Sequence, residues 1–253
     1  MTHLEVVTLR APAKLTLSLR IIGVRADGLH LIDAEMVTLE WADMLAITPG
    51  GSGLSADGPY AVGMPLDNSN LVAKALRLAH REAAVHLTKS IPHGGGLGGG
   101  SSDAAAVLRW AGYSDVVAAA QLGADVSFCL VGGRARVKGI GEIVEPLDFQ
   151  PLDITLIVPP FAVSTPAAYR AWDELGGPRA HGANDLEPAA LQVEPRLAEW
   201  RDRIHEAAGE PPTLAGSGAT WFLVGHHSIA AALPEAMVVQ TRTDRQQRAA
   251  DGR

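Results

Sequence analysis

The glycine-rich segment from Pro92 to Asp103 constrains this chain more than any other feature. It holds six glycines and two serines in twelve residues, and a run of strong helix formers, 104–110, follows at once. Glycine lets backbone N–H groups converge on one point, and the first N–H groups of a helix have no partner within it. The segment therefore predicts an anion site suited to phosphate, with a flexible surface loop as the alternative. The residues expected to form the site are Pro92, Gly94, Gly95, Gly96, Leu97, Gly98, Gly99, Gly100, Ser101 and Ser102.

A Walker A loop is the first known phosphate loop to test against this segment. Gly95 and Gly100 have its spacing, but Ser101 stands where that loop needs a lysine. The lysine that such chemistry requires must therefore come from another part of the chain.

A dinucleotide-binding loop is the second candidate, because Gly94, Gly96 and Gly99 satisfy G-x-G-x-x-G and Asp115 follows at a suitable distance. The preceding segment, 85–91, alternates apolar and polar residues, which indicates a half-exposed strand of a mixed or antiparallel sheet. A dinucleotide fold needs a parallel strand that is buried on both faces. The pattern of this segment therefore argues against that fold.

A third loop fits, because the segment resembles the phosphate loop of the GHMP kinases, with the pattern P-x-x-x-G-L-G-S-S-A-A. The matching residues are Pro92, Gly96, Leu97, Gly98, Ser101, Ser102, Ala104 and Ala105. The form G-G-G-L-G-G-G-S-S-D-A-A resembles one branch of that family, which phosphorylates the 2-hydroxyl of a diphosphocytidyl sugar alcohol in non-mevalonate isoprenoid synthesis. The resemblance implies ATP and Mg²⁺ as cofactors and a small-molecule substrate. It also implies a two-lobed α+β fold, with an N-terminal lobe like ribosomal protein S5 and a ferredoxin-like C-terminal lobe.

Composition limits the partners and the compartment of the chain. The net charge of −7 over 253 residues makes the chain a poor nucleic-acid binder. Cys129 is the sole cysteine, so no internal disulfide forms, which suits a reducing cytoplasm. No signal peptide or membrane-spanning run is evident, and we expect a cytoplasmic monomer or weak homodimer that binds no membrane.

The order of predicted elements indicates an α+β chain of two lobes. We expect a nucleotide-binding and catalytic lobe over 1–150, a second lobe over 151–240, and a disordered tail over 241–253, rich in Arg, Gln and Asp. Strands are expected at 4–22, 31–40, 44–48, 85–91, 127–131, 134–138, 142–146, 151–158, 221–224 and 236–240. Helices are expected at 69–84, 102–111, 114–121, 166–175, 186–190, 194–207 and 228–233.

Lys14 and Asp125 are the candidate catalytic pair. Lys14 lies in an apolar strand, where a charge is costly unless it is paired or lines a cleft, although a snorkelling lysine is the alternative. Asp125 is expected to head a buried strand, with an ordinary turn aspartate as the alternative. Lys14 matches the family motif P-A-K-[IL]-N-L, and Asp125 matches G-A-D-V-P, with Ser127 in place of the proline. The resemblance implies that both residues lie beside the reacting hydroxyl, where we predict that they pair.

A second glycine turn is formed by Gly216, Ser217 and Gly218, within a match to the family motif L-[ST]-G-[ST]-G-[AS]. The resemblance implies a loop that closes over the phosphates or the reacting group. An ordinary tight turn is the alternative.

The expected substrate residues depart from the family pattern at two positions. Leu29 stands where the family has the tyrosine that stacks on cytosine, and Thr16 replaces the asparagine two places after the lysine. His30 matches the histidine that contacts the base, and Tyr169 offers a replacement aromatic ring. Another alcohol, such as homoserine, mevalonate or a sugar, is therefore an alternative substrate, and a silent nucleotide-binding module is an alternative from a different class.

Three further positions carry open or alternative expectations, and one further segment matches the family. Asn70 matches an asparagine near the family's adenine pocket, although capping of the next helix explains it equally well. Ser102 is a candidate Mg²⁺ ligand or a helix N-cap, and the role of Asp103 stays open. The segment Asn184–Glu187 matches the family's N-D-L-E.

Overall fold

The first sheet is built around a long antiparallel hairpin. The computed structural model describes residues 5–245, and in it β1 (Val7–Val24) pairs with β2 (His30–Pro49) along almost its whole length. β2 also pairs with β4 near its C-terminal end and with β5 near its N-terminal end, which gives the order β3-β4-β2-β5-β6. The remaining strands are β3 (Leu54–Asp57), β4 (Ala83–Thr88), β5 (Arg134–Gly139) and β6 (Ile143–Pro146).

The setting of β4 confirms the expectation drawn from its alternating residues. Its side chains are alternately buried and half-buried, and it runs antiparallel to β2 and parallel to β3. The strand before the glycine-rich segment therefore belongs to a mixed sheet with one covered face, and not to a dinucleotide fold.

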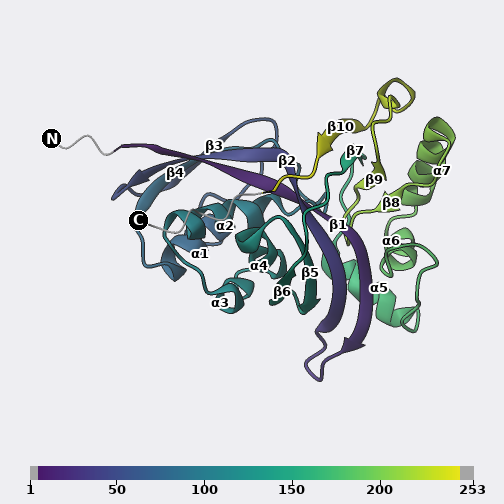
Figure 1. Cartoon of the computed structure of the whole chain (residues 1–253), viewed down its shortest axis with the longest axis horizontal. Helices are drawn as coiled ribbons and strands as arrows, with labels where there is room; N and C mark the ends of the chain where they lie inside the picture. The colour runs from purple at the N-terminus through teal and green to yellow at the C-terminus, as the bar shows by residue number, and fades with distance from the viewer. Residues whose placement is uncertain (1–4, 246–253) are drawn as a thin grey trace.

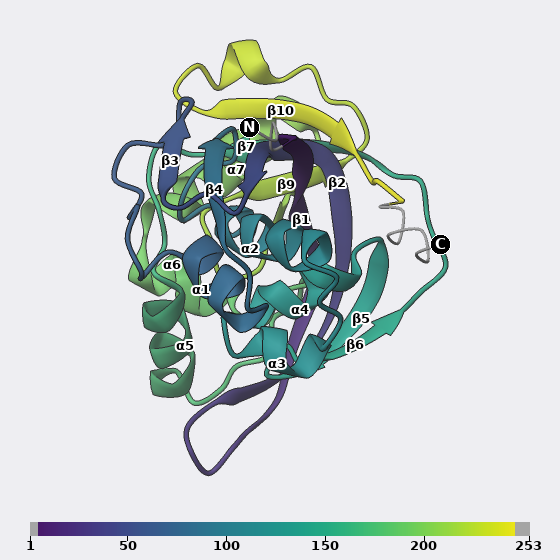
Figure 2. The same cartoon turned by 90° about the vertical axis from the view of Figure 1, so that its left-hand side faces the viewer.

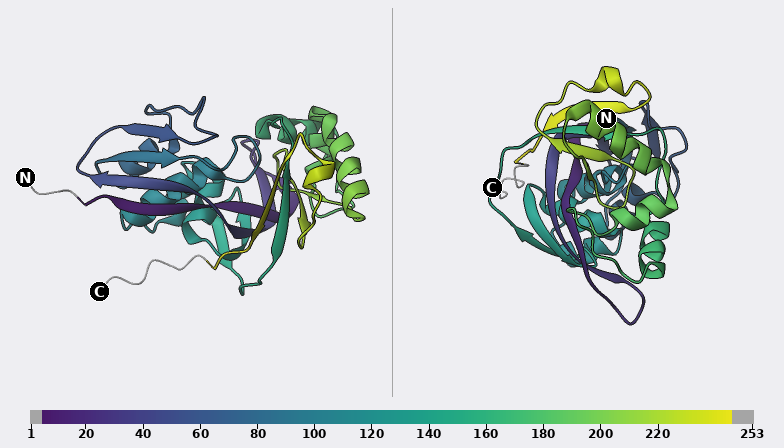
Figure 3. Two further views of the ribbon diagram at one scale, coloured as in Figure 1. Left: turned by 90° about the horizontal axis from the view of Figure 1, so that it is seen from above. Right: turned by 90° about the vertical axis from the view of Figure 1, so that its right-hand side faces the viewer.

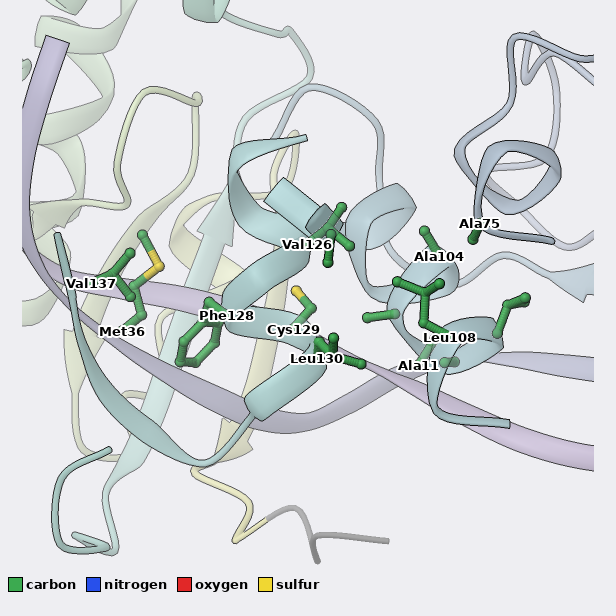
Figure 4. Close-up of a cluster of buried hydrophobic side chains, with 14 of the residues drawn as sticks. Ala11, Met36, Ala75, Ala104, Leu108, Val126, Phe128, Cys129, Leu130 and Val137 are labelled. Carbon is green, nitrogen blue, oxygen red and sulfur yellow. The ribbon is translucent and has the colours of Figure 1, made fainter. Parts of the chain in front are cut away.

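Helices α1 to α4 cover one face of this sheet (Figure 2). They are α1 (Leu71–Leu78), α2 (Gly99–Trp110), α3 (Val116–Ala120) and α4 (Ala124–Val131). Figure 4 shows Phe128 and Cys129 of α4 beside Met36 of β2, with Leu108 of α2 in the same cluster. α2 and α4 therefore lie in the core between the sheet and the outer helices.

A second, antiparallel sheet of order β10-β7-β9-β8 follows in the chain. Its strands are β7 (Asp153–Val158), β8 (Thr213–Leu214), β9 (Trp221–Val224) and β10 (Met237–Arg242). Its helices are α5 (Thr165–Glu174), α6 (Glu187–Val193) and α7 (Arg196–Ala208). Figures 1 and 3 show these elements at one end of the molecule, next to the half of the β1–β2 hairpin that contains its turn.

A separate apolar cluster joins the two sheets. It brings Leu15 and Leu39 of the first sheet against Ile154 and Phe222 of the second, with Leu97 of the glycine-rich segment in the same cluster. Leu97 is 1% exposed, so its side chain anchors the loop in this cluster. Burial of this side chain fixes the glycine-rich segment at the junction of the two lobes.

The α+β, two-lobed architecture is as predicted, but several elements differ. Residues 31–40 and 44–48 form one continuous strand, and 127–131 belongs to helix α4 rather than to a strand. The segment 228–233 contains only a short 3-10 turn, Ala230–Ala232. The helix expected over 69–84 ends at Leu78, and His80 then adopts a positive φ of 50° before β4 begins.

The C-terminal segment extends the second sheet, which corrects the tail expected from residue 241. Thr241 and Arg242 lie in β10, the Thr243 N–H donates to the Leu152 carbonyl, and the Asp244 N–H donates to the Thr38 carbonyl. Residues 246–253 lie outside the described part of the chain.

Candidate active site

The glycine-rich segment forms a loop that leads directly into the buried helix α2. The helix begins at Gly99, earlier than expected, and its N-cap Gly98 has φ 69° and makes no side-chain capping bond. The first N–H groups of α2 are therefore free to bind an anion, and the helix dipole favours negative charge there. A hollow of about 230 Å³ lies at this point. Its lining includes Pro92, Gly94, Gly96, Leu97, Gly98, Gly99, Gly100 and Ser101.

Close packing explains why this loop needs glycine at Gly98. A Cβ there would lie 2.7 Å from Cγ of Lys14, and the positive φ disfavours any side chain. The Lys14 N–H also donates to the Leu97 carbonyl at 3.0 Å. The phosphate loop and the strand that carries the candidate lysine are therefore in direct contact.

Lys14 and Asp125 meet as predicted. Lys14 Nζ lies 3.4 Å from Asp125 Oδ2, and the same ammonium donates to Thr16 Oγ1 at 3.1 Å. The β1–β2 register shifts between Pro12 and Lys14, and such a bulge redirects side chains. Asp125 does not head a strand, because it lies in the first turn of α4, where the helix dipole stabilises a carboxylate.

These two residues face a larger cavity of about 620 Å³ between the lobes. The cavity is lined by Lys14, Thr16, Leu19, Gly28, Leu29, His30, Ile32, Met36, Gly96, Ser101, Ala124, Asp125, Ile140, Thr165, Pro166, Tyr169, Arg170, Asp173, Gly216 and Ser217. Gly96 and Ser101 line this cavity and the smaller hollow. The two spaces therefore meet at the phosphate loop, next to the Lys14–Asp125 pair.

The second glycine turn closes one side of the cavity. A Cβ on Gly216 would lie 3.8 Å from Lys14 Nζ, and Gly218 packs so tightly on the backbone of Gly95 that a Cβ there has no room. Ser217 Oγ lies 2.8 Å from Thr165 Oγ1, at the start of α5. The turn is thus packed between the phosphate loop, Lys14 and α5, which argues against an isolated surface turn.

Aromatic side chains form a further part of the cavity wall. His30 Nε2 lies 2.8 Å from Asp173 Oδ1, and the His30 and Tyr169 rings are 4.7 Å apart. Burial raises the pKa of Tyr169 to about 12, so its phenol stays neutral. Leu29 also lines the cavity and is 45% exposed, so no aromatic ring occupies its position in the wall.

Arg170 and Asp173 are cavity residues that the sequence analysis did not identify. Together with Pro166 and Tyr169 they occupy one face of α5, at helical spacing. The one available signal was that these polar residues recur on the same face as the tyrosine. Arg170 lines the cavity with no ion-pair partner among residues 5–245, whereas Lys14 pairs with Asp125.

The N-D-L-E segment attaches the C-terminal lobe to β1 and to the second glycine turn. Asn184 is buried, and its side-chain amide donates to the carbonyls of Leu214 (3.0 Å) and Gly216 (2.6 Å). Asp185 accepts from the Arg20 guanidinium at 2.7 Å and from the Ile21 N–H at 3.1 Å. The motif match was recognised, but its role as a clamp required the three-dimensional arrangement.

Two predicted site residues are engaged elsewhere. Asn70 caps α1, since its Oδ1 accepts from the Val72 N–H at 2.8 Å, and it lines neither the hollow nor the cavity. Ser102 is not the N-cap of α2, because its buried hydroxyl donates to the Pro12 carbonyl at 2.6 Å. The capping explanation therefore holds for Asn70, and Ser101 rather than Ser102 presents a hydroxyl at the site.

Comparison with known proteins agrees with this geometry. Residues 70–133 match the family described as GHMP kinases N terminal domain. A 4-diphosphocytidyl-2-C-methyl-D-erythritol kinase from Paracoccus denitrificans is 39% identical over 231 residues, and the alignment covers 84% of each chain. This chain belongs to the GHMP kinase family. A further relative of this GHMP kinase, from Pelotomaculum thermopropionicum, has the same name and is 36% identical over 86% of this chain and 88% of its own.

Solved structures give the same assignment for the fold of this GHMP kinase. A crystal structure of 4-(cytidine 5'-diphospho)-2C-methyl-D-erythritol kinase superposes with a TM-score of 0.75 at 32% identity, covering 94% of this chain and all of the other. A homoserine kinase from Cytophaga hutchinsonii superposes with a TM-score of 0.68 at 16% identity, over 97% of each chain. The second likeness shows the fold alone.

Proposed function

We propose that this chain is an ATP-dependent kinase that phosphorylates the 2-hydroxyl of 4-diphosphocytidyl-2-C-methyl-D-erythritol. The observation that carries the proposal is the Lys14–Asp125 pair beside the phosphate loop, in a chain whose relatives bear the name of that kinase. A phosphoryl transfer needs a cradle for the triphosphate, a group that orients the attacking oxygen, and positive charge near the transferring oxygens. The loop provides the cradle, Asp125 is the orienting group, and Lys14 provides the positive charge.

Two groups of cavity residues suit the two functional parts of such a substrate. The rings of His30 and Tyr169 offer a place for a base, and Lys14 and Asp125 lie where the hydroxyl would react. Arg170 lines the cavity as a cation with no ion-pair partner in residues 5–245, which suits a diphosphate. We assign base binding to Leu29, His30 and Tyr169, and binding of the reacting end to Thr16 and to the Gly216–Gly218 turn.

In this mechanism Asp125 accepts a hydrogen bond from the acceptor hydroxyl and takes its proton as the new P–O bond forms. The bond between the γ-phosphorus of ATP and the β–γ bridging oxygen breaks in the same step, and ADP leaves. The Lys14 ammonium, oriented by Asp125 and Thr16, stabilises the negative charge that develops between the hydroxyl and the phosphoryl group. The N–H groups at the start of α2 hold the polyphosphate. Because the site holds the reactants in one geometry, positioning adds to this electrostatic stabilisation.

Mg²⁺ fits the site without a large protein cage. No group of three or more His, Cys, Asp or Glu side chains suited to a metal ion occurs within residues 5–245. Mg²⁺ commonly uses one or two protein oxygens together with substrate phosphates and water. Ser101 lines the cavity where its hydroxyl would supply such an oxygen, and the bound ion would neutralise phosphate charge.

The lobes divide these tasks in our proposal. Residues 1–150 carry the phosphate loop, Lys14 and Asp125, and residues 151–240 supply α5 and the second glycine turn. No helix within residues 5–245 is long and apolar enough to cross a membrane. We propose that the kinase works in the cytoplasm as a monomer or weak homodimer, without nucleic-acid or membrane partners.

A coupled ADP-release assay tests the proposed function. The diphosphocytidyl alcohol is expected to stimulate ADP release strongly, whereas homoserine, mevalonate and simple sugars are not. Leu29 and Thr16 favour the second candidate, a kinase for another alcohol, because they alter the pocket at the positions that would contact the substrate. Stimulation by one of those alcohols alone would establish the second candidate, and ATP binding without turnover on any alcohol would contradict both.

A further inference from the structure

A buried ionic triad lies beneath the phosphate loop, outside the hollow and the cavity. Lys89 is 1% exposed, and its ammonium donates to Asp43 Oδ2 and to Asp103 Oδ2. All three side chains are almost fully removed from solvent, and none lines the hollow or the cavity. Burial of three charged groups is costly, so a stable fold retains them only where they are well paired.

The triad contacts the chain on both sides of the phosphate loop. Asp43 lies on β2, and its Oδ1 accepts from the backbone N–H groups of Ser90 (2.5 Å) and Ile91 (2.9 Å), directly before the loop. Asp103 lies in α2, directly after the loop. A Cβ on Gly99 would lie 3.3 Å from Asp43 Oδ2, so the first turn of α2 also packs on the triad.

We propose that Lys89, Asp43 and Asp103 tie the entry of the phosphate loop to its exit, which makes Lys89 and Asp103 positioning residues for the nucleotide polyphosphate. The proposal rests on the nucleotide binding proposed above. The loop N–H groups bind an anion well only if they point to one place before it arrives. A single ammonium that bonds both ends of the loop holds that arrangement.

The two arms of the tie differ in strength. Asp43 accepts from Lys89 and from two backbone N–H groups, whereas the buried Asp103 Oδ1 has no hydrogen-bond partner among residues 5–245. The pKa of Asp103 is raised to about 7, mainly by burial. The Lys89 ammonium lowers this pKa, and the Asp43 carboxylate raises it. Cys129 on α4 also interacts with Asp103, and burial raises the pKa of that thiol to about 12, so it is neutral. Ionisation of Asp103 therefore adds negative charge beside the anion site as the pH rises through about 7.

Two substitutions at Asp103 distinguish the effect of its contact with Lys89 from the effect of its negative charge. Asp103→Asn keeps an oxygen that accepts from Lys89, whereas Asp103→Ala removes the contact to α2. Asp103→Ala is expected to raise the KM for ATP at least about tenfold, with little change in kcat or in the KM for the alcohol, because a hydrogen bond to a charged group is lost. Asp103→Asn is expected to restore ATP affinity.

A second test compares the ATP affinity of the wild type with that of Asp103→Asn at about pH 6 and about pH 8. This comparison needs no destabilised variant. The two proteins are expected to bind ATP equally at the lower pH. At the higher pH the wild type is expected to bind several-fold more weakly, because ionised Asp103 repels the polyphosphate. Calorimetric titration with ATP gives this ratio even if the alcohol substrate is misassigned, so failure of the proposed function leaves the test intact.

Thr155→Val is a matched control, because Thr155 is buried in β7 and its Oγ1 donates to the Gly225 carbonyl, away from the loop. It is expected to lower the melting temperature without changing ATP affinity. If Asp103→Ala behaves in the same way, or if the ratio of ATP affinities does not change with pH, the triad serves only stability and the proposal is wrong.

Discussion

Lys14 Nζ lies 3.4 Å from Asp125 Oδ2, although one residue belongs to the first strand and the other to a helix more than a hundred positions later. The bulge beside Lys14 and the first turn of α4 bring the two side chains to one wall of the cavity. The almost fully buried ammonium has Asp125 and Thr16 as partners, so its position is fixed before substrate arrives.

Replacing either member of this pair is expected to remove turnover without removing nucleotide. Lys14→Ala and Asp125→Ala should each lower kcat by about 10²- to 10⁴-fold, the usual contribution of a positioned acid–base or electrostatic group. ATP should still raise the melting temperature of both variants, because the N–H groups of the loop are unchanged. Lys138→Ala is the control, since that lysine pairs with Glu145 at the surface. Full activity in either site variant would refute its assigned role.

The close approach of Gly98 to Lys14 gives a second prediction. Gly98→Ala should abolish ATP binding and turnover, because its Cβ would meet Lys14 Cγ at 2.7 Å. Gly112→Ala is the matched control, since Gly112 has a similar φ of 73° with nothing within 4 Å of the added Cβ. The control should lose only the backbone term of about 1 kcal/mol. Urea unfolding and ATP titration of both variants distinguish the cost of a positive φ from the steric clash with Lys14. Equal losses of stability and of ATP affinity in the two variants would contradict this explanation.

The sequence predicted the parts of this structure whose signal is local. The loop was predicted because glycine followed by helix formers has few explanations, and β4 because its alternating residues match its one covered face. The pairing of Lys14 with Asp125 was also predicted, but on the strength of the family resemblance rather than on spacing. A local pattern is informative when one face of an element is buried and the other is not.

The sequence-based predictions were wrong where an element is buried on all sides or where distant contacts decide the structure. Helix α4 was predicted as a strand because the consecutive residues from Val126 to Leu130 are all buried, so no apolar stripe distinguishes a helix from a strand. Long-range contacts decided the other cases: Ser102 donates to Pro12, and Asp103 faces Lys89. No spacing within the segment 92–103 encodes either partner.

The open aromatic position at Leu29 gives a third prediction. Leu29→Tyr should lower the KM for the diphosphocytidyl alcohol about two- to tenfold, because an aromatic contact contributes about 0.5–1.5 kcal/mol beyond its buried area. Val24→Tyr is the matched control, because Val24 is exposed on the same hairpin and does not line the cavity. Steady-state kinetics with the alcohol as the varied substrate measure the effect. An unchanged KM in Leu29→Tyr would indicate that the base does not lie against this position.

The raised pKa of Asp103 gives a prediction for stability. A carboxyl whose pKa is higher in the folded than in the unfolded state binds more protons when folded, so it makes the free energy of unfolding fall as the pH rises. With a pKa of about 7 in the fold and 3.8 as the ordinary value, this loss should occur between about pH 4 and pH 7. Asp103→Asn should lack this component. Urea unfolding of both proteins across that range tests the difference, and parallel curves would contradict the assigned pKa.

The clamp formed by Asn184 gives the last prediction. Asn184→Ala removes the donors to the carbonyls of Leu214 and Gly216, so the second glycine turn loses its link to α6 and β1. The free energy of unfolding should fall by about 3 kcal/mol, because the buried Gly216 carbonyl and the Leu186 N–H each lose the side-chain partner that Asn184 provides. Turnover should fall as well, since the turn packs against Lys14, while ATP affinity stays near that of the wild type.

Asn68→Ala is the control for this variant, because Asn68 is an exposed asparagine whose amide oxygen accepts from Arg77 at 2.7 Å, away from the cavity. It should change neither stability nor kcat appreciably. Hydrogen exchange at residues 214–220 reports the clamp directly, and faster exchange there is expected in Asn184→Ala alone. Wild-type exchange together with a normal kcat would mean that β8, β9 and the phosphate loop hold the turn without Asn184.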